Sequence, residues 1–263
     1  MNYEKYLNLI EVNKKNTLNY LYLAQLQINH ILSIPFENLD IQAGITISLL
    51  EKDLFTKIIE NKRGGFCYEL NYLFYFLLKE LGFDVYLASA QFYHPAKKTF
   101  APEFDHLTLV VQLEKKYLVD VGFGDSFRVP IPIPDGQIKD ISGTYRVYHN
   151  EGEEFFLQRL NEDTWLTQYK FKLVPRDIKE FYPMCVYHQT SPDTIFTQRK
   201  LCTIATPMGR VTISDESLTV TQNRLKEKFI IKSPDEFNEK LKIHFGMDFN
   251  KIKEFNIDKI KQM

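Results

Sequence analysis

The chain has little cysteine, and its few cysteines stand far apart. Only Cys67, Cys185 and Cys202 occur in 263 residues, and no two of them have the close spacing of a zinc or redox motif. An odd, sparse set argues against a disulfide framework. We therefore expect free thiols in a reducing compartment, the cytoplasm, and no bound metal. Each thiol is then either a buried apolar group or a reactive one.

An excess of one charge, long apolar runs and a secretory segment are also lacking. The 33 basic and 34 acidic residues give a formal net charge of −1, which provides no global field to attract nucleic acid or an anionic membrane. No stretch approaches the roughly 18 consecutive apolar residues of a membrane span, and the amino terminus has no apolar signal core. We expect no nucleic-acid or membrane partner, and nothing in the sequence specifies an oligomeric state.

No internal repeat, low-complexity tract or flexible Gly/Ser linker interrupts the chain, so its regions are expected to pack against one another. Residues 1–84 have helical periodicity, with a break at Ile34 and Pro35. From Val85 to about Gln189 the pattern changes to short β-type runs, which predict an antiparallel sheet curled into a barrel or sandwich. Further strands are predicted at 196–203 and 210–214. The pattern as a whole indicates an α+β protein.

The sequence pattern predicts two helices most clearly. Residues 67–81 carry one apolar face and end at Gly82, a residue common just past a helix terminus. The apolar positions of that face are Leu70, Leu73, Phe74, Leu77, Leu78 and Leu81. The second helix is expected to begin after Ser233, with Pro234 at its first position and Glu236 completing a capping box.

Cys67 stands at the start of the clearest helix. Unpaired N–H groups and the helix dipole favour an anion at that position, so we expect a lowered pKa of the thiol. The preceding Gly64 and Gly65 are expected to let the backbone bend sharply and to leave room for a substrate. Most free cysteines are nevertheless small buried apolar residues, so the interpretation of Cys67 as a nucleophile depends on the residues that could activate it.

Candidate partners flank one predicted hairpin. His106 begins its first strand, and Asp120 ends an otherwise apolar second strand, where a lone carboxylate would be costly to bury. A three-residue turn would place both side chains on one face, whereas a two-residue turn would place them on opposite faces unless a bulge intervenes. With Cys67 they would supply a nucleophile, a base and a group that orients the base.

Five motifs in order resemble those of the arylamine N-acetyltransferase family. They are residues 35–39 (PFENL), 63–71 (RGGFCYELN), 105–107 (DHL), 119–124 (VDVGFG) and 190–196 (TSPDTIF). The resemblance implies a helical bundle over 1–84, a central antiparallel β-barrel over 85–192 and a C-terminal α/β lid over 193–263. It also implies a cysteine-proteinase-like Cys-His-Asp core, with Cys67, His106 and Asp120 where the first two parts meet.

The same resemblance implies double-displacement chemistry. Acetyl-coenzyme A would acetylate Cys67, and an arylamine, hydrazine or N-hydroxyarylamine would then take the acetyl group from the thioester. Backbone N–H groups near Cys67 are the natural oxyanion donors.

Further site residues follow from matching family positions. Phe36, Phe123 and Phe196 match the walls of the acceptor pocket, and Phe92 matches a pocket position often held by a smaller residue, which suggests a narrower pocket. For the coenzyme, Gly124 and Tyr187 match positions near the bound molecule in some relatives. Lys97 and Lys98, in a loop between predicted strands, could meet its phosphates electrostatically.

Two other functions share this pattern. A cysteine hydrolase of the transglutaminase or papain type uses the same residue order, and it would turn over without an amine because water attacks the acyl-enzyme. A binding module that has kept the fold would gain no acetyl group at all. The intact Cys67, His106 and Asp120 argue against that last alternative.

Overall fold

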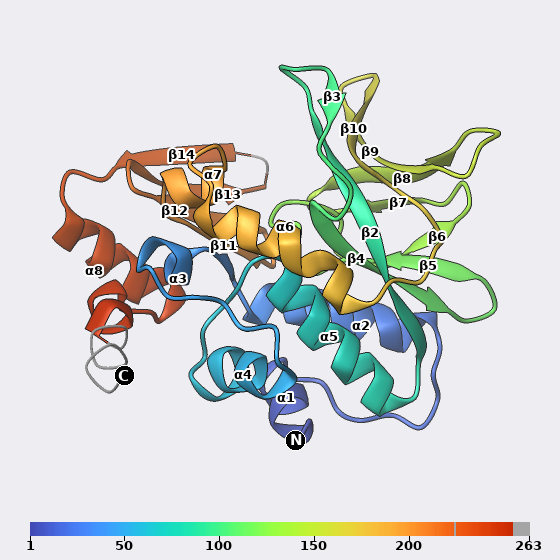
Figure 1. Cartoon of the computed structure of the whole chain (residues 1–263), viewed down its shortest axis with the longest axis horizontal. Coiled ribbons are helices and arrows are strands. Elements are labelled where there is room, and N and C mark those ends of the chain that lie inside the picture. The colour runs from blue at the N-terminus through green and yellow to red at the C-terminus, as the bar shows by residue number, and fades with distance from the viewer. Residues whose placement is uncertain (224, 255–263) are drawn as a thin grey trace.

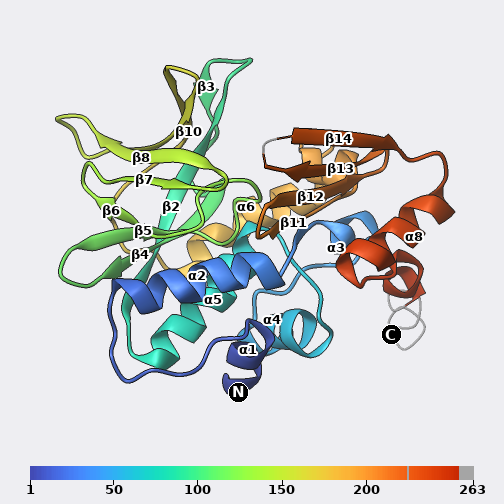
Figure 2. The same ribbon diagram turned by 180° about the vertical axis from the view of Figure 1, so that it is seen from behind.

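The computed structural model describes residues 1–223 and 225–254, which combine helices with two antiparallel sheets (Figures 1 and 2). The first helices of the chain lie below the sheets in both views. They are α1 (Glu4–Leu9), α2 (Tyr20–Ser33), α3 (Leu39–Gln42), α4 (Glu51–Phe55), the π-helical turn η1 (Thr56–Glu60) and α5 (Cys67–Leu81). The expected α+β class is confirmed.

Helix α5 is the centre of the helical part, and its bounds are those predicted. Its six apolar face positions are all buried. At roughly 1.5–3 kcal/mol for each fully buried large apolar side chain, this face supplies most of the helix's stability. The Glu69 carboxylate accepts a hydrogen bond from the Phe66 N–H at the start, and Gly82 ends the helix with a φ of 95°.

A histidine lies fully buried on α2. Nδ1 of His30 is 2.6 Å from the Tyr6 hydroxyl, while Nε2 has no hydrogen-bond partner within the described residues. Burial lowers the pKa of His30 to about 3, because the imidazolium would lose its water. The ring is therefore neutral in the folded protein, and it accepts the Tyr6 proton at Nδ1.

Acidification should destabilise the fold through His30. The folded-state pKa lies below the ordinary value of about 6.5, so only the unfolded chain gains this proton as the pH falls from about 6.5 towards about 3. From pH 7 to pH 5 this residue alone should remove about 2 kcal/mol of unfolding free energy. Urea unfolding of wild type and His30→Gln at both pH values measures it, since glutamine keeps an acceptor for Tyr6 but does not titrate. If the unfolding free energies of the two proteins changed equally with pH, the loss of stability would not come from His30.

The larger sheet curls into a nearly closed barrel. Its path runs β6-β5-β4-β2-β10-β9-β8-β7; a short turn connects the end strands β6 and β7, and the Val147 N–H on β8 donates to the Gly136 carbonyl oxygen in that turn. Of the barrel and the sandwich that the sequence left open, the structure has the barrel. Its strands are β2 (Asp84–His94), β3 (Thr99–Phe100, paired with β2), β4 (His106–Gln112), β5 (Lys116–Val119), β6 (Ile131–Ile133), β7 (Gln137–Asp140), β8 (Gly143–His149), β9 (Phe155–Asn161) and β10 (Thr164–Phe171).

The register of the β4–β5 hairpin determines whether His106 and Asp120 lie on the same face. Gln112 pairs with Lys116, which leaves a three-residue turn, and Leu109 pairs with Val119. Because side chains alternate along a strand, this register places His106 and Asp120 on the same face of the ribbon.

The smaller sheet combines one strand from the N-terminal part of the chain with four strands from the C-terminal part. Its order is β1 (Phe36–Glu37), β11 (Leu201–Thr206), β12 (Gly209–Ser214), β13 (Ser217–Gln222) and β14 (Leu225–Ile230), and α8 (Pro234–Phe245) packs on it. Ser233 caps α8 as predicted, but the Glu236 carboxylate accepts from the N–H of Lys232 rather than from that of Ser233. The capping box is thus only half formed. Residues 255–263 of the predicted lid lie outside the described residues.

Two strand predictions are wrong. Residues expected to be β-type up to Gln189 include α6 (Ile178–Thr190), and the strand expected at 196–203 starts only at Leu201, after the short helix α7 (Ile195–Gln198). The Asp177 side chain caps α6 by accepting from Lys179 N. Phe181, Cys185 and His188 are its buried residues, and this helical spacing is hard to recognise in a short aromatic-rich segment. In Figure 1, α6 crosses in front of α5.

Candidate active site

Cys67 is the first residue of α5, and only 4% of it is exposed. The backbone of Gly122, in the loop after β5, lies directly against it. A Cβ on Gly122 would be 2.8 Å from the Cys67 Cα and 2.9 Å from the Cys67 carbonyl oxygen, closer than real Cβ atoms come. Glycine is therefore required there, and the close contact holds the loop that follows Asp120 against the start of α5.

The prediction of a lowered thiol pKa is wrong. Burial raises the pKa of Cys67 well above its ordinary value, because the thiolate would lose its water. The nearby charge of Asp105 raises it further, as do Cys185 and Asp120, while a hydrogen bond with the Leu107 backbone opposes them. The helix start alone thus does not ionise this sulfur, and a thiolate needs a positive partner.

The two glycines before Cys67 serve packing rather than a sharp bend. Neither has a positive φ. A Cβ on Gly64 would lie 2.1 Å from the Pro35 carbonyl oxygen, so no other residue allows β1 to pass this closely. The Glu37 N–H donates to the Gly65 carbonyl at 2.9 Å, and the motifs at 35–39 and 63–71 therefore lie side by side.

His106 and Asp120 form the imidazole–carboxylate pair that the sequence predicts. His106 Nε2 lies 2.7 Å from Asp120 Oδ2, and both side chains are buried. Asp120 Oδ1 accepts from Asn71 Nδ2 and from the Gly122 N–H, each at 2.9 Å, and Oδ2 also accepts from the Tyr169 hydroxyl at 3.1 Å. With four donors around it, the carboxylate is satisfied as an anion. The Nε2 proton of His106 then points to Asp120, which leaves Nδ1 as the basic nitrogen.

Sequence reasoning assigned no role to Asn71 or Tyr169. Asn71 lies one helical turn after Cys67; its amide donates to Asp120 and to the Leu107 carbonyl and accepts from the Val121 N–H. A polar residue on the apolar face of α5 was a signal that could have identified it. Tyr169 comes from β10, 49 residues after Asp120, and only the pairing of β10 with β2 brings it to the site.

A buried ionic network lies behind the start of α5. Lys57 Nζ is 2.8 Å from carboxylate oxygens of both Asp40 and Glu69, and Arg63 Nη2 is 2.6 Å from Glu37 and 2.8 Å from Asp40. Removing one member of such a network leaves a buried charge unpaired and lowers the free energy of unfolding by about 3–5 kcal/mol, so the members stabilise the fold only together. Its five members connect the motif at 35–39 with the motif at 63–71 that contains Cys67, and they fix the direction in which α5 begins.

The predicted pocket aromatics lie in two pairs beside His106 and the start of α5. The Phe36 and Phe196 rings are 6.2 Å apart, the Phe92 and Phe123 rings are 6.1 Å apart, and the Phe123 ring is 5.3 Å from that of His106. The structure thus brings all four Phe side chains to the region where α5, the barrel and the smaller sheet meet.

Residues proposed for the coenzyme are spread more widely. Gly124 has a φ of 85° and lies beside Phe36, whereas Tyr187 is 42% exposed on α6. Lys97 and Lys98 are exposed in the turn between β2 and β3, at the tip of a hairpin that projects away from the helices (Figures 1 and 2).

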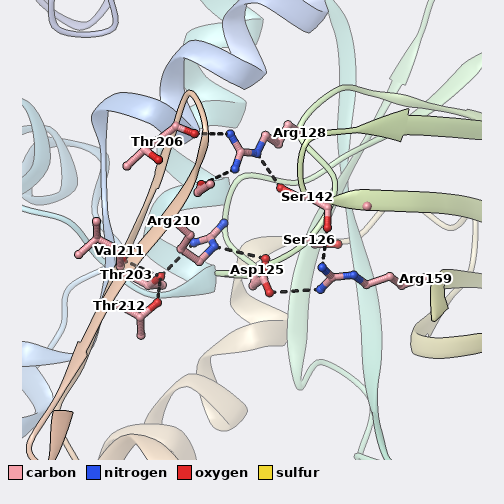
Figure 3. Close-up of polar contacts among 12 residues, drawn as sticks. Asp125, Ser126, Arg128, Ser142, Arg159, Thr203, Thr206, Arg210, Val211 and Thr212 are labelled. Carbon is pink, nitrogen blue, oxygen red and sulfur yellow. Dashed lines mark hydrogen bonds and ion pairs between the residues drawn. The ribbon is translucent and has the colours of Figure 1, made fainter. Parts of the chain in front are cut away.

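Beside Gly124, a cluster of arginines joins the barrel to the smaller sheet (Figure 3). Arg159 and Arg210 share the carboxylate of Asp125, at 3.2 and 3.3 Å. The buried guanidinium of Arg128 donates to the carbonyl oxygens of Thr206 and Gly209, in the β11–β12 turn. The loop that carries Phe123 is held between the two sheets in this way.

Two observations concern the part of the chain that the structure describes. In residues 1–223 and 225–254, every helix is too short or too polar to cross a bilayer. The same ranges contain no group of three or more His, Cys, Asp or Glu side chains placed to hold a metal ion.

Comparisons with known proteins agree with the geometry of the site. The N-acetyltransferase family profile matches residues 19–254. The arylamine N-acetyltransferase of the pineal gland, isozyme NAT-10, from Gallus gallus is 31% identical over 245 residues, which cover 83% of this chain and 84% of that protein.

Solved structures are similar over nearly the whole chain. The arylamine N-acetyltransferase of M. smegmatis has a TM-score of 0.88 at 27% identity, with 96% of this chain and 94% of that chain covered. That of Bacillus cereus, described with a Cys-His-Glu catalytic triad, has a TM-score of 0.86 at 27% identity, with 93% and 98% covered. The chain therefore belongs to the arylamine N-acetyltransferase family and is an acyltransferase.

Proposed function

We propose that Cys67 carries an acetyl group from acetyl-coenzyme A to the nitrogen of an arylamine or hydrazine, or to the oxygen of an N-hydroxyarylamine, in a ping-pong reaction. The observation that carries this proposal is the His106–Asp120 pair beside the start of α5, in which the carboxylate lies 2.7 Å from His106 Nε2 and accepts from three further donors. The names of the relatives support the acceptor class.

In the first half-reaction, Nδ1 of His106 takes the thiol proton, and the thiolate attacks the acetyl carbonyl. The carbon–sulfur bond to coenzyme A breaks, and coenzyme A leaves as the thiol with the proton from His106. Because burial raises the pKa of Cys67, the sulfur ionises as one half of a thiolate–imidazolium pair, and Asp120 stabilises the imidazolium.

In the second half-reaction, the acceptor nitrogen attacks the acetyl-Cys67 thioester and gives its proton to His106. The carbon–sulfur bond breaks, the acetylated product leaves, and Cys67 recovers its proton. Phe36, Phe92, Phe123 and Phe196 would enclose the aromatic ring and exclude water, while Gly124, Tyr187, Lys97 and Lys98 would contact the coenzyme.

The proposal includes the predicted organisation and location. A helical unit over 1–84 would carry the nucleophile, a barrel over 85–192 its base and carboxylate, and a lid over 193–263 would cover the pocket. All three cysteines among the described residues are free, which suits the cytoplasm.

Intact-mass spectrometry with acetyl-coenzyme A tests the proposal. We expect a gain of one acetyl group on Cys67, stable until an aromatic amine is added, with free coenzyme A released in steady state only when the amine is present. Amine-independent release would favour the hydrolase, and a protein that gains no acetyl group would favour a binding module of the same fold. A panel of aromatic amines and hydrazines then identifies the acceptor.

A further inference from the structure

A second imidazole–carboxylate pair, which the reaction above does not use, lies beside Cys67. His188 on α6 has its Nε2 3.2 Å from Asp105 Oδ1 and 3.3 Å from the Asp105 carbonyl oxygen. The side chain of His188 is 8% exposed and that of Asp105 is 16% exposed, so both are largely shielded from water. A pair this enclosed interacts more strongly than a surface pair does.

Contacts on both sides place Asp105 next to the nucleophile. The hydroxyl of Tyr68, the residue after Cys67, lies 2.7 Å from the Phe104 carbonyl oxygen and 3.0 Å from that of Asp105, and Asn71 Nδ2 donates to the Leu107 carbonyl oxygen at 2.7 Å. Asp105 therefore lies between two points at which its segment touches the start of α5. Its negative charge acts on the thiol more strongly than that of Asp120 and disfavours the thiolate.

Aromatic rings and one carboxylate surround the His188 imidazole. The centroid of the Phe196 ring is 5.2 Å from that of the His188 ring. The titratable groups that face the imidazole are Asp105, Tyr68 from α5 and Tyr187 from α6 itself. Its Nδ1 is buried and has no hydrogen-bond partner within the described residues. Among the residues that the structure describes, the contact with Asp105 is thus the one polar contact of this imidazole.

We propose that His188 is a positioning residue that compensates the Asp105 charge and thereby sets how readily Cys67 ionises. The Nε2–H group of His188 donates to the Asp105 carbonyl oxygen and lies 3.2 Å from the Asp105 carboxylate, so the positive end of this N–H dipole offsets part of the carboxylate charge. Acetylation of Cys67 therefore depends on His188 although His188 does not touch the reacting atoms. This inference deepens the proposed function and rests on Cys67 as its nucleophile.

Removing the imidazole should expose Cys67 to the full charge of Asp105. We expect His188→Leu to raise the pH midpoint of Cys67 alkylation by iodoacetamide by about one unit and to slow single-turnover acetylation at pH 7 about tenfold. Asp105→Asn should lower the midpoint in the wild-type background. In the His188→Leu background it should restore the midpoint and rate, because no charge then remains to compensate. Asp163→Asn, in the exposed turn between β9 and β10, is the control and should change neither.

The double variant separates charge from structure. If His188 only holds the backbone at Asp105 in place, Asp105→Asn restores nothing in the His188→Leu background, and the proposal is overturned; unchanged midpoints in all variants overturn it as well. His188→Gln, whose amide can still donate to Asp105, gives the same test with a conservative change and should show a smaller upward shift. Peptide mass spectrometry assigns the label to Cys67. Alkylation requires no coenzyme, so a wild type that gains no acetyl group refutes the proposed function separately.

Discussion

Replacing Cys67 with serine is expected to lower the acetylation rate at least a thousandfold, because a hydroxyl that does not ionise takes the place of a thiol that reacts as a thiolate. Burial already raises the pKa of the thiol, and the same loss of water would act on an alkoxide, whose parent hydroxyl is a much weaker acid. A factor of a thousand corresponds to about 4 kcal/mol of activation free energy. Single-turnover acetylation and steady-state turnover with an aromatic amine measure the loss.

The Cys67→Ser experiment has an internal control. Cys202 is also a fully buried thiol with a raised pKa, but it lies on β11 in the core of the smaller sheet. Cys202→Ala should therefore keep the wild-type rate within about threefold, whatever its effect on stability. Thermal unfolding of Cys67→Ser should resemble that of wild type, because the side chain keeps its size. Turnover above about a tenth of wild type in Cys67→Ser would place the nucleophile elsewhere.

Local patterns predicted much of the fold. The apolar face of α5 and the glycine after it gave both helix ends, because helix periodicity and a left-handed cap depend on residues close in the chain. The β4–β5 hairpin was also recognised, but its turn length, and hence the shared face of His106 and Asp120, could be given only as alternatives. One residue more or less in the turn reverses the face.

Contacts between distant segments could not be predicted in the same way. Tyr169 reaches Asp120 only because β10 pairs with β2, and His188 reaches Asp105 only because α6 folds back over α5. The pKa of Cys67 was predicted with the wrong sign for a related reason. The helix start is visible in the sequence, whereas the burial that outweighs it comes from the packing of the whole core.

Asp120→Asn is expected to reduce acetylation by about 10³- to 10⁴-fold, by analogy with the equivalent change in a serine protease triad. The reason lies in the four donors around this carboxylate. Oδ1 faces Asn71 Nδ2 and Gly122 N, and Oδ2 faces His106 Nε2 and the Tyr169 hydroxyl. In either orientation the new NH₂ group faces other hydrogen-bond donors. It can donate to His106 Nε2 only if the ring proton moves to Nδ1. That tautomer cannot accept the Cys67 proton.

Tyr169→Phe is the matched control for Asp120→Asn, because it removes one of the four donors and leaves the His106–Asp120 hydrogen bond in place. It should cost less than about tenfold, since one hydrogen bond to a charged group contributes about 1.5–3 kcal/mol and only part of that acts on the orientation of His106. The pH profile of single-turnover acetylation separates the two variants: Tyr169→Phe should keep the wild-type profile at a lower rate, whereas Asp120→Asn should lose the limb that reports the basic Nδ1. If Asp120→Asn stays within tenfold of wild type, the carboxylate does not fix the His106 tautomer, and the orientation of the base must come from the ring contacts with Phe123 and Tyr169 instead.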